Sequence, residues 1–535
     1  MKQVKKGMHK SISFLLIFVV ILSVFIGQPK TVSAETESGV NFVVGFDAEF
    51  PPYGYKNEAG EYVGFDLDLA QEVANRKGWI LVKQPINWDS KDEELNTGMI
   101  DCIWNGFTIN GREDKYTWSV PYVDNSQVVV VKTESDITVL NDLKGKVVAV
   151  QNDSSALAAF AGDGATEENK ALASEFKELQ RIGDYNSAFM NLEAGMVDAI
   201  CMDIGVAMYQ LEARGAKLRM LEEQVSTEQY AIGFKLGNET MRDEVQNTLK
   251  EIYQDGTFDK IAEQWGLSDC VCLDKYFGEE SQVEQGTTGE VDSASKSEKG
   301  MLSSIGTYAK ELLAGSIASI EIFFLTILFS LPLGLMIMFV RRSKYKLLQW
   351  IAKIYISIMR GTPLMLQLWV VFFGPHYISQ AIGGVLKTFF GYNDFVGIQL
   401  SSEYRFYAVI IGFSVNYAAY FAEIFRAGIE AVPVGQTEAA KVLGYSRTQI
   451  FGRIIFPQMV KRVMPPVTNE IITLVKDTSL AFAIAHTEMF TIAKQTAAAS
   501  ASIMPIVVAG VFYYIFNFVV AFVMSKIEKK MSYFS

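Results

Sequence analysis

The hydrophobic and polar positions of the chain divide it into regions with different periodicities. Residues 41–275 alternate short apolar runs, such as NFVVGFD (41–47), with segments whose apolar residues recur at helical spacing, such as GFDLDLAQEVANRKG (64–78). A short continuous apolar run predicts a buried strand, and a spacing of three and four residues predicts an amphipathic helix. Strands that alternate with helices predict an α/β domain with largely parallel sheets.

The two halves of residues 41–275 follow a similar pattern. In each half, a helical segment ends near a glycine and an apolar run follows, IDCIWNG at 100–106 and VDAICMD at 197–203. This repetition predicts two similar α/β lobes. Residues 276–300 then lose the apolar periodicity, and from residue 279 onward they contain almost no large apolar side chain. That segment predicts a flexible linker.

Five long apolar segments follow the linker, and each is long enough to cross a bilayer as a helix. They cover residues 319–340, about 354–378, about 407–427, about 465–484 and 503–524. Clusters of Lys and Arg at 341–346, 426–462 and 526–530 all fall on one side of these spans. The positive-inside rule places that side in the cytoplasm. We therefore expect an all-α transmembrane domain of five spans at 301–535 in the plasma membrane, with residues 41–275 outside the cell and the C-terminus inside.

The charge distribution supports this division. The 535-residue chain has a net charge of −12, whereas residues 301–535 contain 20 Lys and Arg against 11 Asp and Glu, a net charge of +9 that leaves −21 on residues 1–300. An acidic half and a basic, apolar half predict two modules. The basic residues adjoin apolar spans, where they set topology, so no nucleic-acid partner is predicted.

Residues 1–34 have the composition of a secretory signal peptide. Four lysines precede or adjoin the apolar run SFLLIFVVILSVFIG at 13–27, and the small residues VSA at 32–34 form a cleavage site. An uncleaved anchor helix is the alternative, because the apolar run is long. In either case we expect the domain that follows to be exported.

Four cysteines and three histidines offer little for a metal site, and we expect neither a metal nor a cofactor. Cys102 and Cys201 lie in strand-like runs and are predicted to be buried, inert thiols. Cys270 and Cys272 form a CVC pair, and one of them could join a disulfide outside the cell.

Polar and aromatic residues follow several predicted strands, at the edge where open α/β sheets bind ligands. They are Asp47, Phe50, Tyr53, Trp88, Thr108, Arg112, Ser154, Ser155 and Asp203. An Arg fork and hydroxyls suit a carboxylate, a carboxylate suits an ammonium, and aromatic rings enclose a side chain. Together these groups predict a site for a zwitterionic amino acid.

Each of these residues also has a purely structural explanation. Arg112 could be a solvated surface side chain, Ser154 could only cap a helix, and Asp203 could end a strand in a turn. Phe50 and Trp88 are aromatic residues of a kind found more often in cores than in pockets. The prediction of a site depends on their joint occurrence.

Residues 41–275 resemble a polar amino-acid substrate-binding protein of the bacterial solute-binding family 3 type. The matching phrases are VGFDLDLA (63–70), GFTINGRED (106–114), KGKVVAVQ (144–151) and DGTFDKIAEQWG (255–266). The resemblance implies a two-lobed periplasmic-binding-protein fold of type II, with a ligand cleft that closes about a hinge. It implies a first lobe of about 41–128 and 230–275 and a second lobe of about 133–225.

The resemblance also implies roles for individual residues. Arg112 would clamp the α-carboxylate, with help from Thr108 and from Ser155 at the start of a helix. Asp203 would take the α-ammonium. The other residues expected to line the pocket are Asp47, Phe50, Trp88, Asn105, Gly106 and Gln151, with the two aromatic rings beside the ligand side chain.

The ligand is expected to be an L-amino acid with a polar side chain. Gln151 favours a neutral side chain, as in glutamine or cystine. Asp47 and Glu49 could instead serve a cationic one.

Residues 301–535 resemble the permease subunit of polar amino-acid ABC importers. The matching phrases are MRGTPLMLQLWVVFFGP (359–375), the segment 417–458 that includes EAAKVLGYSRTQIFGRIIFPQ, and PPVTNEIITLVKDTSLAFAI (465–484). The resemblance identifies the family's EAA coupling loop at about 428–457, with Glu438, Ala439, Ala440 and Gly444. It implies that this loop docks in a groove of a cytoplasmic ATPase, with Gly444 allowing a turn between two short helices. A membrane-surface helix that binds anionic lipid is the alternative.

The sequence contains no GxxxxGK[ST] motif, so we expect a separate ATPase subunit to hydrolyse ATP and this chain not to be an enzyme. Five spans resemble half of a translocation path, so a homodimer in the membrane is expected. Glu321, Lys476 and Asp477 lie in or near spans and are candidate functional charges without an assigned role.

These observations predict a fused substrate-binding and permease subunit of an ABC importer that captures a polar amino acid outside the cell. An amino-acid-gated channel is one alternative, but it would insert its pore between the lobes and carry a TVGYG-like filter. A membrane-anchored amino-acid sensor is the other alternative, and it would need a signalling module where this sequence has KIEKKMSYFS.

Overall fold

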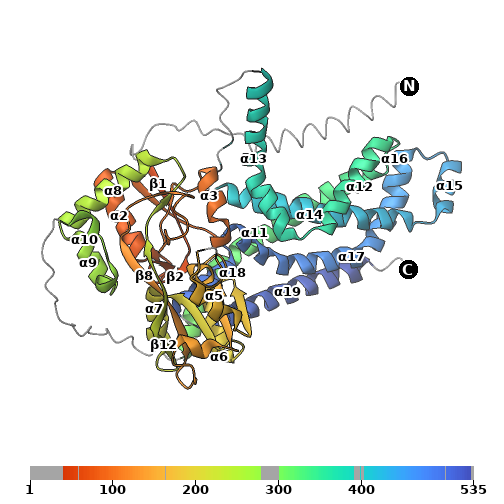
Figure 1. Ribbon diagram of the computed structural model, residues 1–535. Helices are drawn as coiled ribbons and strands as arrows, with labels where there is room; N and C mark the ends of the chain where they lie inside the picture. The colour runs from red at the N-terminus through yellow and green to blue at the C-terminus, as the bar shows by residue number, and fades with distance from the viewer. Residues whose placement is uncertain are drawn as a thin grey trace. The chain divides into compact units, whose positions relative to one another are not determined.

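The computed structural model describes residues 40–57, 59–162, 164–278, 301–390, 398, 400, 403–500 and 502–531 (Figure 1). The predicted signal peptide at 1–34 lies outside these residues. So does the polar segment 279–300 of the predicted linker.

The first sheet belongs to the N-terminal lobe. Its strand order is β5 (Ile80–Pro85), β1 (Asn41–Phe46), β6 (Cys102–Ile103), β13 (Gly233–Phe234) and β7 (Thr117–Trp118). β5, β1 and β6 are parallel, whereas β13 is antiparallel to both of its neighbours. The helix predicted at 64–78 forms as α2 (Phe65–Lys77), and Gly78 ends it in the left-handed conformation. α8 (Glu239–Gln254) and α9 (Thr257–Gln264) pack beside it.

The second sheet has a related topology. Its strand order is β10 (Glu178–Ile182), β9 (Val147–Gln151), β11 (Ala199–Asp203), β8 (Val123–Lys132) and β12 (Leu218–Tyr230). β10, β9 and β11 are parallel, and β8 and β12 add antiparallel strands at one side. The helices of this lobe are α4 (Ser155–Ala161), α5 (Glu167–Ser174), α6 (Tyr185–Ala194) and α7 (Ile204–Arg214). The α/β class predicted for this region is confirmed, although each sheet also has an antiparallel part.

Two antiparallel strands carry the chain between the lobes. β8 starts at Val123, shortly after β7 of the first sheet, and β12 ends at Tyr230, shortly before β13. Val123 pairs with Tyr230 in this ladder. A short pair of connections lets two rigid lobes rotate about a hinge.

The remaining elements of the two lobes are short. They are β2 (Glu49–Phe50), β3 (Gly54–Lys56), β4 (Tyr62–Val63), η1 (Trp88–Ser90), α3 (Lys91–Thr97), η2 (Leu140–Leu143), η3 (Ser268–Cys270) and α10 (Asp274–Phe277).

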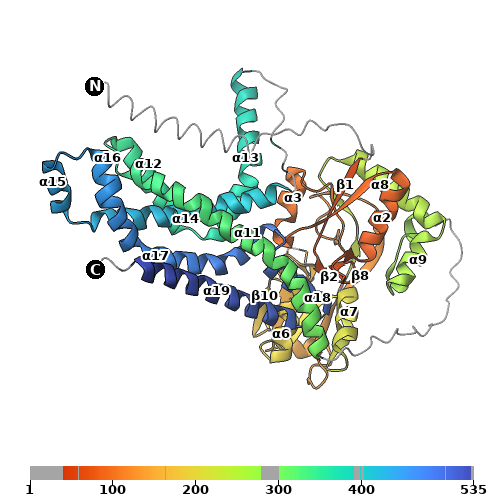
Figure 2. The same ribbon diagram turned by 180° about the vertical axis from the view of Figure 1, so that it is seen from behind.

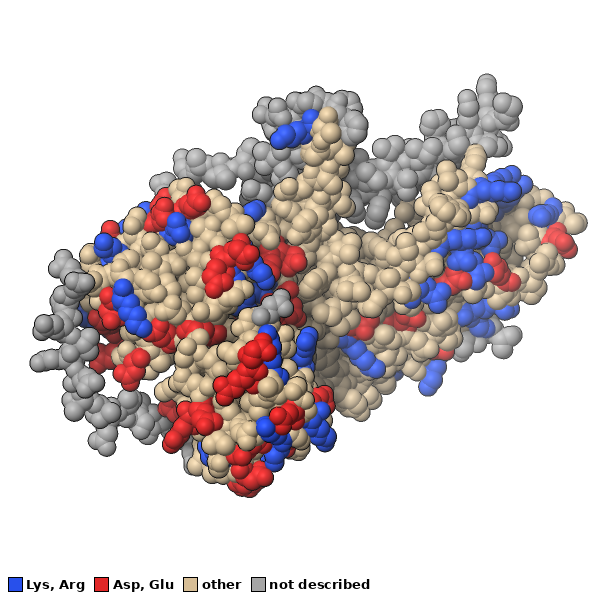
Figure 3. All heavy atoms as spheres, viewed as in Figure 1, with Lys and Arg blue, Asp and Glu red and all other residues tan. Residues whose placement is uncertain are grey.

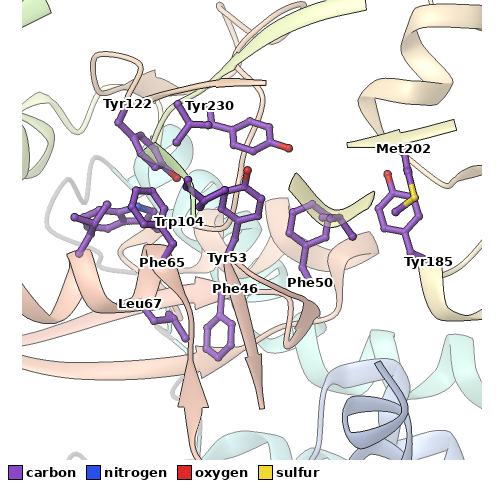
Figure 4. Close-up of a cluster of buried hydrophobic side chains, with 14 of the residues drawn as sticks. Phe46, Phe50, Tyr53, Phe65, Leu67, Trp104, Tyr122, Tyr185, Met202 and Tyr230 are labelled. Carbon is purple, nitrogen blue, oxygen red and sulfur yellow. The ribbon is translucent and has the colours of Figure 1, made fainter. Parts of the chain in front are cut away.

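Aromatic side chains from both lobes meet in one buried cluster. Figure 4 shows Tyr53 beside Tyr230 and Phe50 beside Tyr185. The ring centroids of Phe50 and Tyr185 are 6.1 Å apart, although the first residue lies in β2 and the second in α6. Ring contacts of this kind add to the burial of apolar area and hold the lobes in one arrangement.

The second region is helical. It comprises α11 (Met301–Arg341), α12 (Lys346–Gly361), α13 (Leu364–Phe390), α14 (Tyr404–Glu430), α15 (Val434–Val442), α16 (Arg447–Ile450), η4 (Phe451–Ile455), α17 (Phe456–Asp477), η5 (Thr478–Ile484), α18 (Met489–Ser500) and α19 (Met504–Met531). α11, α14, α17 and α19 run side by side in both views (Figure 1, Figure 2). α14 contacts α11, α12, α13 and α17 and buries most of its side chains, so it is the central helix.

Three helices of the described residues are long and apolar enough to cross a membrane, namely Gly306–Arg341, Tyr404–Glu430 and Met504–Met531. They contain the first and third predicted spans and all of the fifth except residue 503. The helical class is confirmed for this region, whereas the count of five spans is not, because three or at most four candidates are found in the described part of the chain.

The second predicted span, at about 354–378, is divided between two helices that together are long and apolar enough to form one broken span or a re-entrant loop. α12 and α13 meet at a bend of 115°. Thr362 lies between them with extended backbone angles, φ −118° and ψ 148°. Pro363 disfavours the helical conformation in the residue that precedes it, which accounts for the break. The span predicted at 465–484 corresponds to parts of α17 and η5, which are not among the candidates.

Candidate functional site

A cavity of about 350 Å³ lies between the two lobes, where β1, β6, β9 and β11 end. Its lining includes all ten residues predicted from the sequence, which are Asp47, Phe50, Trp88, Asn105, Gly106, Thr108, Arg112, Gln151, Ser155 and Asp203. Phe107, Asp153 and Ser154 line it as well. Tyr53 is fully buried in the aromatic cluster and does not line the cavity.

The two lobes touch each other beside this cavity. Ser155 Oγ donates a hydrogen bond to Thr108 Oγ1 at 2.8 Å. Arg112 Nη2 donates to the backbone oxygen of Asp153 at 2.9 Å, and Lys91 forms an ion pair with the Asp153 carboxylate. Each contact joins a residue of the first lobe to a residue of the second, so the cleft is in a closed arrangement.

Arg112 presents a guanidinium that the surrounding residues hold in place. Its Nη1 donates to the Thr108 carbonyl at 3.2 Å, and its Cζ lies 5.3 Å from the centre of the Phe107 ring. The other guanidinium N–H groups and the nearby hydroxyls can bind a carboxylate. Ser154 has the capping role considered for it, because its Oγ accepts a hydrogen bond from the Leu157 N–H at 3.1 Å.

Asp203 accepts hydrogen bonds from four neutral side chains. Asn125 Nδ2 and Gln127 Nε2 donate to its Oδ1 at 2.8 and 2.7 Å. The Tyr230 hydroxyl donates to the same oxygen at 2.6 Å, and the Tyr185 hydroxyl donates to Oδ2 at 2.9 Å. None of these donors carries a charge, so the carboxylate remains available to pair with an ammonium group.

Glu228 is a second buried carboxylate, and no motif in the sequence had singled it out. Its Oε1 accepts from Asn125 Nδ2 at 2.5 Å and from Gln127 Nε2 at 2.7 Å, the same groups that bind Asp203. Burial, followed by the neighbouring charge of Asp203, raises the pKa of Glu228 to about 7. A cation in the cleft would stabilise both carboxylates in their ionised form.

Another pair of carboxylates lies at the edge of the cleft. The Glu49 N–H donates to Asp47 Oδ1 at 2.9 Å. Burial raises the pKa of Asp47 to about 6 and the pKa of Glu49 to about 7. Lys494, in α18 of the helical region, lies 3.2 Å from Glu49 Oε1 and 3.5 Å from Asp184 Oδ2. Because Glu49 belongs to the first lobe and Asp184 to the second, one lysine pairs with both lobes.

Further contacts join the binding region to the helical region. Arg405 of α14 forms an ion pair with Glu94 of α3. The Tyr209 hydroxyl of α7 donates to the Ala499 carbonyl of α18 at 3.1 Å. Through such contacts the residues from Asn41 onward form one compact unit. The sequence did not indicate these pairs, because their members are about 290 to 311 residues apart.

The predicted coupling loop forms two short helices joined by a turn. Glu438, Ala439 and Ala440 lie in α15, before the turn. Gly444 has a φ of 80°, in the left-handed region that favours glycine, as the predicted turn requires. Val442 and Leu443 are 87% and 75% exposed. Exposed apolar side chains at such a turn suit contact with another protein.

The four cysteines are free thiols, so the disulfide considered for Cys270 or Cys272 does not form within the chain. Cys102 and Cys201 are buried, as predicted.

One of the candidate charges in or near the spans has a hydrogen-bond partner. Asp477 accepts a hydrogen bond from the Tyr417 hydroxyl at 2.6 Å.

Two protein families match the chain. Residues 42–268 match the bacterial extracellular solute-binding proteins, family 3. Residues 330–533 match the binding-protein-dependent transport system inner membrane component.

Individual relatives include permease proteins of amino-acid transport systems. The arginine transport system permease protein ArtQ of Bacillus subtilis (strain 168) is 31% identical over 221 residues, which are 41% of this chain and 92% of that protein. The L-cystine transport system permease protein TcyL of the same organism is 38% identical over 185 residues, 35% of this chain and 72% of that protein. Among solved structures, an ABC uptake transporter substrate-binding protein from Streptococcus pneumoniae with bound histidine is 33% identical, covers 42% of this chain and 92% of its own, and has a TM-score of 0.40.

We expect Glu228→Gln to flatten the pH dependence of stability. The pKa of Glu228 is about 7 in the folded state against an ordinary value of 4.5, so the folded state loses stability as the pH rises from about 4.5 to about 7 and the carboxyl ionises. The variant should therefore gain about 1–3 kcal/mol over the unsubstituted chain above pH 7.5 and little below pH 4.5. Thermal unfolding followed by tryptophan fluorescence across this range measures the difference.

Glu222→Gln is the matched control, because Glu222 is exposed on the same strand, β12. Its pH profile should coincide with that of the unsubstituted chain. Parallel profiles for Glu228→Gln and the unsubstituted chain would contradict the assignment of a raised pKa to this carboxyl.

Proposed function

This chain belongs to the amino-acid ABC transporter permeases and carries a family 3 solute-binding domain on the same polypeptide, and we propose that its cleft captures one polar amino acid outside the cell and delivers it to the helical region. The chain is a fused substrate-binding and permease subunit of an amino-acid importer. The observation that carries the proposal is the presence of Arg112 and Asp203 in one closed cavity whose walls come from both lobes. Residues 41–275 would form the extracellular binding domain and 301–535 the permease domain.

The backbone groups of the amino acid would bind to charged and polar side chains of both lobes. The Arg112 guanidinium and the Ser155 hydroxyl would hold the α-carboxylate, with Thr108 fixing both of them. Asp203 would accept the α-ammonium, and Glu228 would add a second negative charge beside it. Because the groups come from the two lobes, a bound ligand would favour the closed cleft over the open one.

The side chain of the amino acid would lie among Phe50, Trp88 and Gln151. Gln151 Nε2 donates to the Gly183 carbonyl at 3.4 Å, which directs its amide and leaves the carbonyl oxygen of the side chain as an acceptor. We therefore propose a polar, neutral side chain. A cationic side chain is the second candidate, because Asp47 lines the same cavity.

The direct test is calorimetric titration of the full chain in lipid nanodiscs with a panel of L-amino acids. One polar amino acid should bind, and Arg112→Ala or Asp203→Ala should weaken binding about 100-fold or more, since each change leaves a buried charge of the ligand without its partner. Arg181→Ala, at an exposed position of β10, is the matched control and should bind as the unsubstituted chain does. Absence of binding by every amino acid would contradict the proposal, and so would full affinity in both cleft variants.

We propose that the helical region crosses the membrane five times, with α17 and η5 as the crossing that length and composition do not single out. α17 packs against α14 and α19, as a member of the same bundle would. Lys and Arg side chains gather at the end of the helical region near α15 and α16 (Figure 3). By the positive-inside rule this end would face the cytoplasm, and the binding domain would lie outside.

We further propose that the loop of α15 and α16 docks a separate ATPase subunit. Its exposed Val442 and Leu443 offer apolar contact area, and the glycine turn keeps the two helices short and compact. A second copy of the chain would complete the translocation path. The outer face of α19 is available to lipid or to that copy, because it exposes Tyr514, Phe518 and Phe522. The mass of the purified protein in nanodiscs tests whether one or two copies are present.

Leu443→Glu should uncouple transport from binding. A carboxylate in the docking surface would lower amino-acid uptake at least tenfold in cells that contain the ATPase, because a desolvated, unpaired charge costs several kcal/mol. The affinity of the nanodisc protein for its amino acid should stay within twofold. Leu236→Glu is the control, at a position 63% exposed in the binding domain. Unchanged uptake by Leu443→Glu would exclude the turn as the docking site.

A further inference from the structure

A second cavity, of about 410 Å³, lies where the binding domain meets the helical region. Residues of the first lobe form one wall, including Asp47, Glu49 and Asn87, and residues of η5 and α18 form the other, including Phe482, Lys494 and Gln495. Asp47 lines both this cavity and the ligand cleft. The second cavity therefore adjoins the cleft on the side of the permease.

The walls of this cavity contain hydrogen-bond acceptors that have no donor. Gln495 is only 4% exposed, and its Oε1 has no partner among the described residues. Glu49 Oε1 pairs with Lys494, but its buried Oε2 likewise has no partner there. A buried acceptor without a donor costs about 1–3 kcal/mol. Two such oxygens in one cavity indicate a site for a group that donates hydrogen bonds.

The charges of the cavity favour a cationic donor. Asp47, Glu49 and Asp184 face the single ammonium of Lys494, which leaves an excess of negative charge in a buried place. Burial raises the pKa of Asp47 to about 6 and the pKa of Glu49 to about 7. The carboxylate of Asp89 is a further negative charge near Asp47. No group of three His, Cys, Asp or Glu residues in the described part of the chain is placed to hold a metal ion, which favours an organic cation.

We propose that this cavity is a transfer subsite, in which Glu49 and Gln495 receive the ammonium group, or a cationic side chain, of the amino acid as it leaves the cleft toward the permease. The proposal rests on the function proposed above, since it takes the same amino acid as its occupant. Asp47 is the shared wall, so a cation that moves from cleft to subsite stays close to a carboxylate throughout. The acceptors of the subsite then replace part of the hydration that the cation would otherwise need.

Gln495→Met tests the subsite, because methionine has a similar volume and no comparable acceptor. The readout is uptake of labelled L-arginine, L-cystine and L-glutamine by cells that lack their own uptake systems and contain the full chain with its ATPase. We expect the maximal uptake rate to fall about tenfold or more, the effect of one lost hydrogen bond to a charged group. The half-saturating concentration, and the affinity measured in nanodiscs, should stay within twofold. Gln495→Glu, which restores an acceptor, should transport at or near the rate of the unsubstituted chain.

Gln210→Met is the matched control for the interface itself. Gln210 is also buried there, and its Nε2 donates to the Ala498 carbonyl at 3.4 Å, but it does not line the cavity. Its uptake should stay within twofold of the unsubstituted chain. The subsite is overturned if Gln495→Met transports normally, if Gln210→Met loses as much activity as Gln495→Met, or if Gln495→Glu fails as well. If the unsubstituted chain neither binds nor transports any amino acid, the proposed function itself fails, and this outcome differs from the other three.

Discussion

The pairing of Lys494 with Glu49 and Asp184 is the contact on which the arrangement of the molecule depends. One ammonium lies 3.2 Å from a carboxylate of the first lobe and 3.5 Å from a carboxylate of the second. Both distances occur with the cleft in its closed arrangement. Breaking a buried pair leaves a charge uncompensated at a cost of several kcal/mol. The helical region thus contacts both lobes of the closed binding domain through Lys494, and it also contacts the first lobe through Arg405 and the second at Ala499.

The cleft and the helical region are linked by the same carboxylates. Under the proposed function, Arg112, Ser155 and Asp203 would hold the ligand in the closed cleft, and in this closed arrangement Glu49 and Asp184 both lie beside Lys494. A ligand that favours the closed state then also favours contact with the permease, and by thermodynamic reciprocity that contact strengthens ligand binding. On this account, capture and delivery of the amino acid would be two consequences of one closing motion.

The α/β class and seven of the ten residues around the cleft could be predicted from the pattern, because those seven follow strands at the ligand-binding edges of the two sheets, whereas Asn105, Gly106 and Gln151 came from the family resemblance. Asn125, Gln127 and Glu228 were missed because they face inward from β8 and β12, whose pairing appears only in the folded chain. Lys494 and Gln495 are hundreds of residues from the groups they face. The bend between α12 and α13 could have been predicted from Pro363, because proline disfavours a helical conformation in the residue before it. The long apolar segment around Pro363 was instead interpreted as one span.

The most direct measurement is the affinity of the full chain in nanodiscs for its amino acid, with and without Lys494→Met. If the helical region recognises the closed cleft through Lys494, the variant should bind about threefold to tenfold more weakly, although Lys494 does not line the ligand cleft. Lys353→Met, at an exposed position of α12, should leave the affinity unchanged. Equal affinity for the Lys494 variant and the unsubstituted chain would contradict the link between cleft closure and the permease.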